Sequence, residues 1–339
     1  MTPHASRRRA TLIGMVAIAL WSALALLTAA SGTTPPFQMT AMTFAIGGLA
    51  GLIVALARGE GAALAQPPIV WLVGVGGLFG YHAVYFAALR KAPPEEASLI
   101  AYLWPLLIVL FSALLPGETL RPRHLLGAAL GFAGAAVLIV GKAGGRALFN
   151  PDHATGYLLA LACAFIWSGY SVLSRRFKSA PTAAVAGFCL ATALLSGLCW
   201  MAFETTRWPQ TTTQWAAVAA LGLGPVGLAF YVWDFGVKHG DIKLLGVASY
   251  AAPVLSTLIL VAAGVARPGW SLALACALIA LGPRREPRRR ITARFREPRR
   301  PRRVPPAAQV GSRSHRRRTS CRRRRFVAFS IVPPAACNM

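Results

Sequence analysis

The chain carries one apolar pattern twice. Six residues of the first half recur in the second half at a nearly constant distance, in the pairs Trp21 and Trp167, Ser22 and Ser168, Pro35 and Pro181, Gly51 and Gly197, Tyr102 and Tyr250, and Pro105 and Pro253. The shift is 146 positions for the first four pairs and 148 positions for the last two. Tryptophan, tyrosine and proline rarely fall in register by chance, so we infer an internal duplication over about residues 10–282.

The composition places both halves in a membrane. Of the 339 residues, 55% are hydrophobic and only 14% are charged, whereas a soluble domain has about 25% charged residues. A helix needs about 20 apolar residues to cross the hydrocarbon core of a bilayer. Nine stretches come close to this length, namely 11–30, 37–57, 69–89, 96–115, 124–141, 155–174, 182–203, 214–236 and 244–263. Since lipid offers the backbone no hydrogen-bond partners, each stretch should be a helix.

A tenth apolar stretch begins at Trp270 and is cut short by Pro283. The sequence therefore predicts an all-α integral membrane protein with ten transmembrane helices, of which the tenth is truncated. Five helices per repeat is an odd number, so the two repeats should insert in opposite orientations, as inverted repeats typical of secondary transporters. The expected parts are an N-terminal segment 1–10, a first repeat 11–141, a loop 142–154, a second repeat 155–282 and a tail 283–339.

The basic residues of the loops predict the orientation. If the N-terminus is cytoplasmic, the cytoplasmic side holds 11 Lys and Arg before the tail, and the opposite side holds six. Cytoplasmic loops carry the excess of basic residues in membrane proteins, so we expect the N-terminus inside. The segment from Arg7 to Arg9 before the first apolar run resembles an export signal. That run contains Trp21 and Ser22, which are repeated in the sixth helix, so we assign it to the fold.

The tail has a different composition from the rest of the chain. Residues 283–339 hold 19 Arg, no Lys and two acidic residues, which gives them 17 of the 26 net positive charges of the chain. Six prolines between Pro283 and Pro306 exclude a long helix, so disorder is expected. Three interpretations stay open: out-of-frame translation of a GC-rich gene, which we favour, contact with anionic lipid, and nucleic-acid binding, which we do not expect.

No motif in the sequence indicates an enzyme. A GxGxxG pattern from Gly222 to Gly227 lies inside an apolar helix and contains Pro225, whereas a dinucleotide site needs a strand before the pattern. There is no P-loop, HExxH or GxSxG motif, and the six cysteines have no metal-type spacing. The prediction is therefore no catalytic residue, no metal site and no cofactor.

Aromatic residues with polar edges are the best candidates for a binding site. They are Trp21, Tyr81, Tyr85, Tyr102, Trp167, Tyr231 and Tyr250. Tyr81 and Tyr85 are four residues apart and share a helix face, and the others occupy matching places in the repeats or lie beside Asp234. If these faces point inward, rings with hydroxyl and indole donors line a cavity for a small amphipathic or aromatic solute. The alternative for each ring is a place at the membrane interface or in helix packing.

Asp234 and two prolines complete the candidate site. An ionisable group inside a membrane is costly, so we expect Asp234 to hold a substrate amine or a proton, with a pair to Lys238 as the alternative. Pro105 and Pro253 fall inside the fourth and ninth helices at matching places. Since proline interrupts helical hydrogen bonds, we expect these two residues to shape gating helices, with simple kinks for packing as the alternative.

Six short segments carry a family resemblance, namely ATLIG and LWS within 10–22, YLWP at 102–105, FIWSGY at 165–170, WDFGVKHG at 233–240 and SYAAPVLS at 249–256. They resemble the aromatic amino-acid exporter branch of the EamA-type drug/metabolite transporter superfamily. The resemblance covers about residues 10–282. It implies a central cavity, alternating access, a bacterial inner membrane and export of aromatic or related small solutes. The chain departs from the family where the tenth helix meets Pro283.

The functional hypothesis is a secondary exporter of aromatic or other small amino acids, with the substrate and the lipid bilayer as its partners. Export of cationic drugs or other metabolites is the alternative within transporters. The rival from another class is a membrane protein without transport activity whose basic tail binds anionic lipid or RNA.

Overall fold

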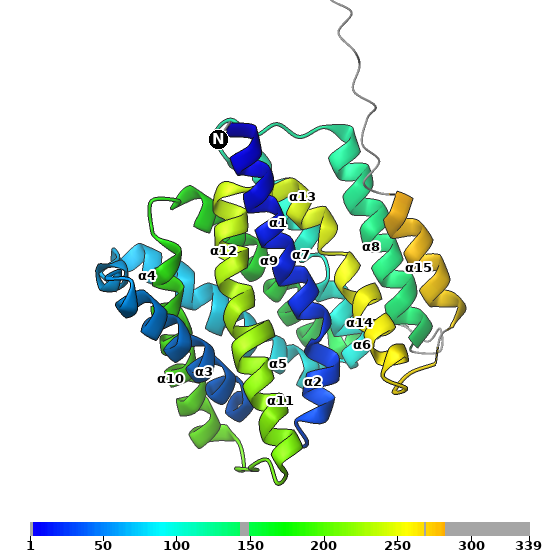
Figure 1. Ribbon diagram of the computed structural model, residues 1–339. Helices are drawn as coiled ribbons and strands as arrows, with labels where there is room; N and C mark the ends of the chain where they lie inside the picture. Colours follow the sequence, from blue (N-terminus) through cyan, green and yellow to red (C-terminus); the bar gives the residue numbers. More distant parts are fainter. Residues whose placement is uncertain (1–2, 143–148, 268, 282–339) are drawn as a thin grey trace, which may run out of the picture. The chain divides into compact units, whose positions relative to one another are not determined.

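The computed structural model describes residues 3–142, 149–267 and 269–281, and within these ranges it contains helices and no strands. The α-helices (Figure 1) are α1 (Pro3–Ser22), α2 (Leu24–Ala30), α3 (Pro36–Ala57), α4 (Pro68–Val75), α5 (Tyr81–Lys91), α6 (Pro94–Ala101), α7 (Trp104–Phe111), α8 (Pro122–Lys142), α9 (Ala154–Arg176), α10 (Val185–Phe203), α11 (Thr212–Leu223), α12 (Ala229–His239), α13 (Ile242–Ala248), α14 (Ala251–Ala262) and α15 (Trp270–Leu281).

In the described ranges, these elements form nine membrane-length helices, because several of them continue into one another. Each is apolar and 20 to 28 residues long, and together they match the nine stretches expected from the sequence. The tenth stretch forms α15, whose 12 described residues extend about 18 Å, shorter than the roughly 30 Å hydrocarbon core. Residues 282–339, which include the predicted tail, lie outside the described residues, so ten spanning helices remain a prediction.

The helix interruptions repeat along with the sequence. A π-helical segment, Gly76–Gly80, joins α4 to α5, and another, Gly224–Leu228, joins α11 to α12. The fourth span breaks at Tyr102, between α6 and α7, and the ninth breaks at Tyr250, between α13 and α14. Both kinds of interruption recur at the shift of 148 positions seen in the sequence. The duplication therefore extends from residue types to local backbone structure.

Proline explains the paired breaks. Pro105 and Pro253 lie in the first turns of α7 and α14, where the missing N–H group costs least because no helical partner exists for it. One partner for the freed backbone comes from the other half of the chain, since the Tyr250 hydroxyl accepts a hydrogen bond from the Leu106 amide at 3.1 Å. A break in one repeat is thus tied to the break in the other.

Helices of the two halves pack against one another rather than forming separate domains. α3 packs on α10 and α8 on α15, and each of these pairs unites equivalent helices of the two repeats. α1 packs on α12, and the equivalent pair, α5 on α9, is also formed. Figure 1 shows α1 and α12 side by side, with α8 and α15 at one edge. The hydrophobic core around Trp167, Phe230 and Trp233 lies where the two halves meet.

Candidate functional site

A cluster of large aromatic rings occupies the centre of the described helices. It contains Trp21 of α1, Trp104 of α7, Trp167 of α9, and Phe230 and Trp233 of α12. The ring centroids of Trp21 lie 5.6 Å from Trp167, 5.1 Å from Trp233 and 6.3 Å from Trp104. Most of the pairs are edge-to-face, the geometry that the ring quadrupoles favour. The repeat partners Trp21 and Trp167 therefore meet at the middle of the structure.

Hydrogen bonds from two indoles fix the cluster. The Trp21 Nε1–H group donates to the Pro225 carbonyl at 3.1 Å, and this carbonyl belongs to the π-helical segment Gly224–Leu228. The Trp233 Nε1–H group donates to the Ser171 hydroxyl, also at 3.1 Å. A buried indole usually finds such a partner. With its donor satisfied, the half-buried Trp21 ring offers mainly apolar surface, whereas Trp233 is fully buried.

Tyrosines extend the cluster along α5. Tyr81 lies 5.5 Å from Trp167 and stacks on Tyr85 at 5.8 Å, and the Tyr85 hydroxyl is 2.9 Å from the Ser98 hydroxyl. Tyr81 and Tyr102 are half-buried. Within the described ranges, no hydrogen bond engages the hydroxyl of either residue. These two hydroxyls are free to bind a solute beside the aromatic rings.

Among the described residues, three other predicted tyrosines make no ring contact with this cluster, and Tyr102 packs in a second apolar group that also contains Tyr250. Tyr250 is fully buried against Phe132, and its hydroxyl is held by the Leu106 amide. Tyr231 faces α3, and its hydroxyl donates to the Gly47 carbonyl at 3.2 Å. Of the seven predicted rings, Trp21, Trp167, Tyr81 and Tyr85 are thus brought together. Substrate contact by any of the seven stays a prediction.

Asp234 is paired in this conformation. Its side chain is 2% exposed, lies 2.8 Å from Lys238 Nζ, and accepts a hydrogen bond from the Thr182 hydroxyl at 2.7 Å. Lys238 also donates to the Ala180 carbonyl at 2.9 Å. This is the alternative that the sequence left open. A role for Asp234 with a substrate amine or a proton requires this pair to open and remains a prediction.

Trp104, Phe230 and Trp233 are members of the cluster that were not among the predicted site residues. Trp104 comes directly before Pro105, so its place at the helix break was a usable signal. Phe230 carries no such signal, because one phenylalanine in an apolar helix resembles any other. Groups of three or more His, Cys, Asp or Glu suitable for a metal ion are absent from the described ranges.

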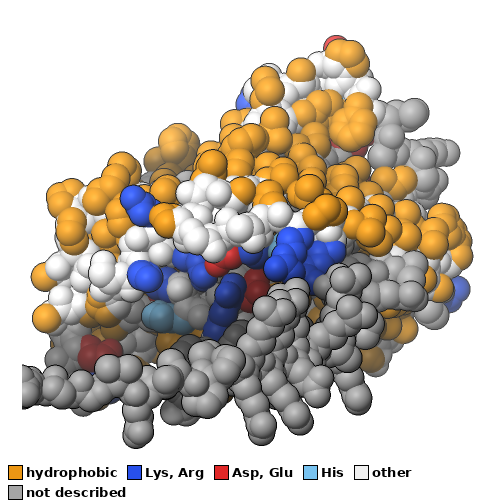
Figure 2. All heavy atoms as spheres, turned by 90° about the horizontal axis from the view of Figure 1, so that it is seen from above, with side chains coloured by type: hydrophobic (Ala, Val, Ile, Leu, Met, Phe, Trp, Pro, Cys, Tyr) orange, Lys and Arg blue, Asp and Glu red, His pale blue; other side chains and the backbone are white. Residues whose placement is uncertain are grey.

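Charged residues close one end of the helical unit. Glu118, between α7 and α8, accepts hydrogen bonds from Arg175 at the end of α9 (2.7 Å) and from Lys243 at the start of α13, and it lies 3.4 Å from Arg7 of α1. Figure 2 shows this end, where basic side chains gather around acidic ones within a hydrophobic rim. Burial alone would raise the pKa of Glu118, but the Lys243, Arg175 and Arg7 charges outweigh burial and lower it.

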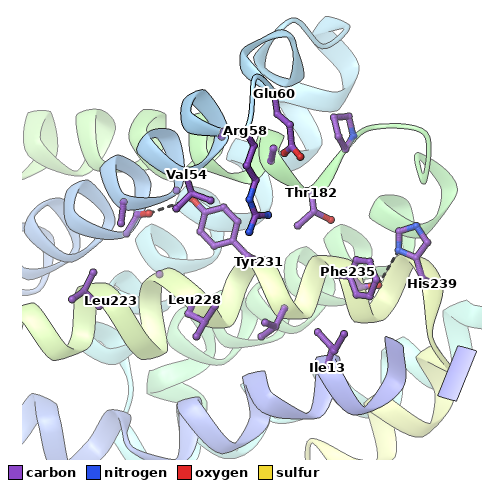
Figure 3. Close-up of a pocket in the computed structure, with 18 residues that line it drawn as sticks. Ile13, Val54, Arg58, Glu60, Thr182, Leu223, Leu228, Tyr231, Phe235 and His239 are labelled. Carbon is purple, nitrogen blue, oxygen red and sulfur yellow. Dashed lines mark hydrogen bonds between the residues drawn. The ribbon is translucent and has the colours of Figure 1, made fainter. Parts of the chain in front are cut away.

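A separate cavity opens between α3 and α12. It has a volume of about 810 Å³, and Val54, Arg58, Thr182, Leu228 and Tyr231 are among its lining residues. Figure 3 shows Arg58 reaching into it beside the Tyr231 ring. Of the predicted site residues, only Tyr231 lines this cavity.

Comparison with known proteins identifies the family. The model of the EamA-like transporter family matches the chain twice, over residues 8–140 and 154–283. The chain belongs to the EamA-like transporter family. The two matches agree with the duplication, and a transporter family excludes the enzyme classes that the motifs had already failed to support.

Relatives of this EamA protein include named exporters. It is 62% identical over 278 residues to the aromatic amino acid exporter YddG of Ancylobacter novellus, covering 82% of this chain and 96% of the relative. It is 28% identical to the protein of the same name from Salmonella typhimurium, covering 74% of this chain and 87% of that one. A solved crystal structure with 62% identity matches with a TM-score of 0.79, covering 82% of this chain and 95% of the other.

Proposed function

We propose that this transporter exports aromatic or other small amino acids by alternating access, from a bacterial cytoplasm across the inner membrane. The observation that carries the proposal is the central cluster, in which Trp21 and Trp167 meet beside Tyr81. Aromatic side chains stack on such rings. The free hydroxyls of Tyr81 and Tyr102 supply polar partners for the ends of an amino acid. The names of the relatives support the same substrate class.

Alternating access is supported by the symmetry of the helix packing. Equivalent helices of the two repeats pack on one another, and both repeats are interrupted at the same places. If the two repeats are inverted, as we propose, they can rock around a site near the bilayer midplane. Pro105 and Pro253 would give the fourth and ninth spans the flexibility for that movement.

We propose that this state is closed at the end of the molecule that holds the N-terminus, and the excess of basic residues in the loops of that end supports a cytoplasmic position. Glu118 joins three spans and a loop there through Arg7, Arg175 and Lys243. At the opposite end, Glu204 accepts hydrogen bonds from the amides of Phe37 and Gln38, each at 3.0 Å, and from Arg90 at 3.4 Å, which join α3 and α5 to the end of α10. The Tyr157 hydroxyl of α9 also donates to Glu96 of α6 there.

The experiment is exchange of labelled phenylalanine, tyrosine and tryptophan in proteoliposomes, with unlabelled glycine and a cationic dye as competitors. We expect exchange that is blocked by aromatic amino acids alone. Blockage by the dye would favour export of cationic drugs or other metabolites, and no exchange from folded protein would contradict the proposal.

Single hydroxyl deletions test the binding site. Tyr81→Phe and Tyr102→Phe each remove one unpaired hydroxyl, and the loss of a hydrogen bond worth about 0.5–1.5 kcal/mol should raise the half-saturating concentration about 2- to 10-fold. Trp208→Phe, at a ring that is 50% exposed, is the matched control and should change nothing. Asp234→Asn with unchanged transport and unchanged pH dependence would remove Asp234 from the proposed site.

A further inference from the structure

The cavity between α3 and α12 is a long groove rather than a compact pocket. Its lining runs along the eighth span from Leu223 to His239, a distance of about 24 Å at 1.5 Å per residue. On α3 it runs from Gly47 to Arg58 at the end of that helix. A bilayer with its headgroups is about 40–45 Å thick, so one leaflet has half of this thickness. The groove is therefore about as long as one leaflet is thick, and it lies in the half of the helical unit that also holds the N-terminus of the chain.

Polarity is sorted along this groove. Towards the middle of the eighth span its walls carry Leu223 and Leu228, which are 55% and 49% exposed, and Val54, which is 48% exposed, lies one helical turn before Arg58. Its ionisable residues, Arg58, Glu60 and His239, all lie at the N-terminal end (Figure 3). An apolar length that ends in charged groups matches an amphiphile standing along the membrane normal.

The floor of the groove has no unsatisfied polar atom on its tyrosine. Tyr231 lies across Gly51, where an added Cβ would come within 1.7 Å of its hydroxyl oxygen. That hydroxyl is already bonded to the Gly47 carbonyl at 3.2 Å. Tyr231 therefore presents the face of its ring to the cavity. An acyl chain can cover this face without leaving a buried donor unpaired.

The two charged residues at the mouth are available to a ligand. Arg58 and Glu60 are exposed, and neither side chain forms a hydrogen bond or an ion pair with another residue of the described ranges. Figure 3 shows the Arg58 guanidinium turned into the cavity between Tyr231 and Thr182, with the Glu60 carboxylate beside it at the mouth. Guanidinium groups bind phosphate through paired N–H donors.

We propose that this groove binds one phospholipid of the surrounding bilayer, with its phosphate on Arg58 and one acyl chain along Tyr231 and Leu228. The adjacent carboxylate of Glu60 selects a headgroup that carries an ammonium group, as in phosphatidylethanolamine. A free amino acid would satisfy the charges at the mouth and leave most of the apolar length empty, so the shape favours the lipid.

The test is lipid retention by the full-length protein, measured by native mass spectrometry with phosphatidylethanolamine or phosphatidylglycerol added in detergent. We expect one retained phosphatidylethanolamine molecule. Arg58→Gln should weaken retention about tenfold, the effect of losing a charge-assisted hydrogen bond. Arg176→Gln, at an exposed basic residue of the same end but outside the groove, is the matched control and should retain the lipid.

Two further variants separate the acyl chain from the headgroup. Ala50→Phe fills the groove and should abolish retention, whereas Leu49→Phe, on the exposed neighbouring face and outside the lining, should not. Glu60→Gln should remove the preference for phosphatidylethanolamine over phosphatidylglycerol. Wild-type retention in both Arg58→Gln and Ala50→Phe would overturn the proposal. Displacement of the lipid by free tryptophan would also overturn it and would reassign the groove to the substrate.

Discussion

Glu118→Gln should loosen the closed N-terminal end of the protein by a measurable amount. The substitution keeps the shape of the side chain and removes its charge. It weakens the hydrogen bonds from Arg175, at 2.7 Å, and from Lys243. A hydrogen bond to a charged group is worth about 1.5–3 kcal/mol, so loss of both sets an upper limit of about 6 kcal/mol.

The backbone reduces this cost. Arg175 also donates to the Val237 and Gly240 carbonyls at 2.8 and 2.9 Å, and Lys243 donates to the Thr119 carbonyl at 3.2 Å. Neither cation is left without an acceptor, so the larger penalty for a stranded buried charge does not apply. We therefore expect the closed arrangement to lose about 2–3 kcal/mol, which corresponds to about a 30- to 150-fold change in an equilibrium constant.

Amide hydrogen exchange measures this change. The Asp241 amide donates to the Thr11 hydroxyl at 2.8 Å, and the Leu245 amide donates to the Asp241 carbonyl at 2.9 Å. Both should exchange about 30- to 150-fold faster in Glu118→Gln if they exchange when this end opens.

The matched control is Arg7→Gln. Arg7 is 46% exposed and contacts Glu118 and Asp241 only at 3.4 and 3.5 Å. Exposed ion pairs contribute about 0–1 kcal/mol, so exchange should rise less than about fivefold. Unchanged protection in Glu118→Gln, or an equal effect of both variants, would refute the reasoning that the buried contacts of Glu118 hold this end closed.

Three other predictions concern pH, helix packing and the aromatic cluster. The folded protein lowers the pKa of Glu118 below its ordinary value of 4.5. Glu118 should therefore stabilise the closed end fully above pH 4.5 and lose this effect as the pH falls through the lowered pKa. Amide exchange, corrected for its intrinsic rate, should then be constant from about pH 6 to 8. Gly51→Ala should lower the unfolding free energy in detergent by about 1–3 kcal/mol, because the new methyl group collides with Tyr231. Its control, Gly197→Ala, has no atom within 4 Å of the new Cβ and should be neutral or stabilising by up to about 1 kcal/mol. Equal effects of the two variants would contradict the close packing of Tyr231 on Gly51. Trp21→Phe removes an indole hydrogen bond to a π-helical carbonyl and should cost about 1–3 kcal/mol in the same assay, and an unchanged midpoint would show that the bond is unimportant.

The sequence alone determined the class of fold. Length and hydropathy fix the nine described membrane-length helices, because a helix must satisfy its own backbone in lipid and must be long enough to cross it. The duplication was also visible in the sequence, because tryptophan, proline and tyrosine are rare enough to mark the register of the two repeats. The family model matches each half once, in agreement with this duplication.

Tertiary structure decided which repeated residues take which part. Trp21 and Trp167 meet at the centre, but Tyr102 keeps a free hydroxyl in the described part of the chain while its partner Tyr250 is buried on the Leu106 amide. Equivalent positions of the two repeats have the same residue type and the same local sequence pattern. Only long-range packing makes their surroundings differ. Glu118 gave no local sign of its role, because its cationic partners come from distant segments of the chain. The lateral groove likewise exists only where α3 and α12 leave space between them, which no pattern within either helix records.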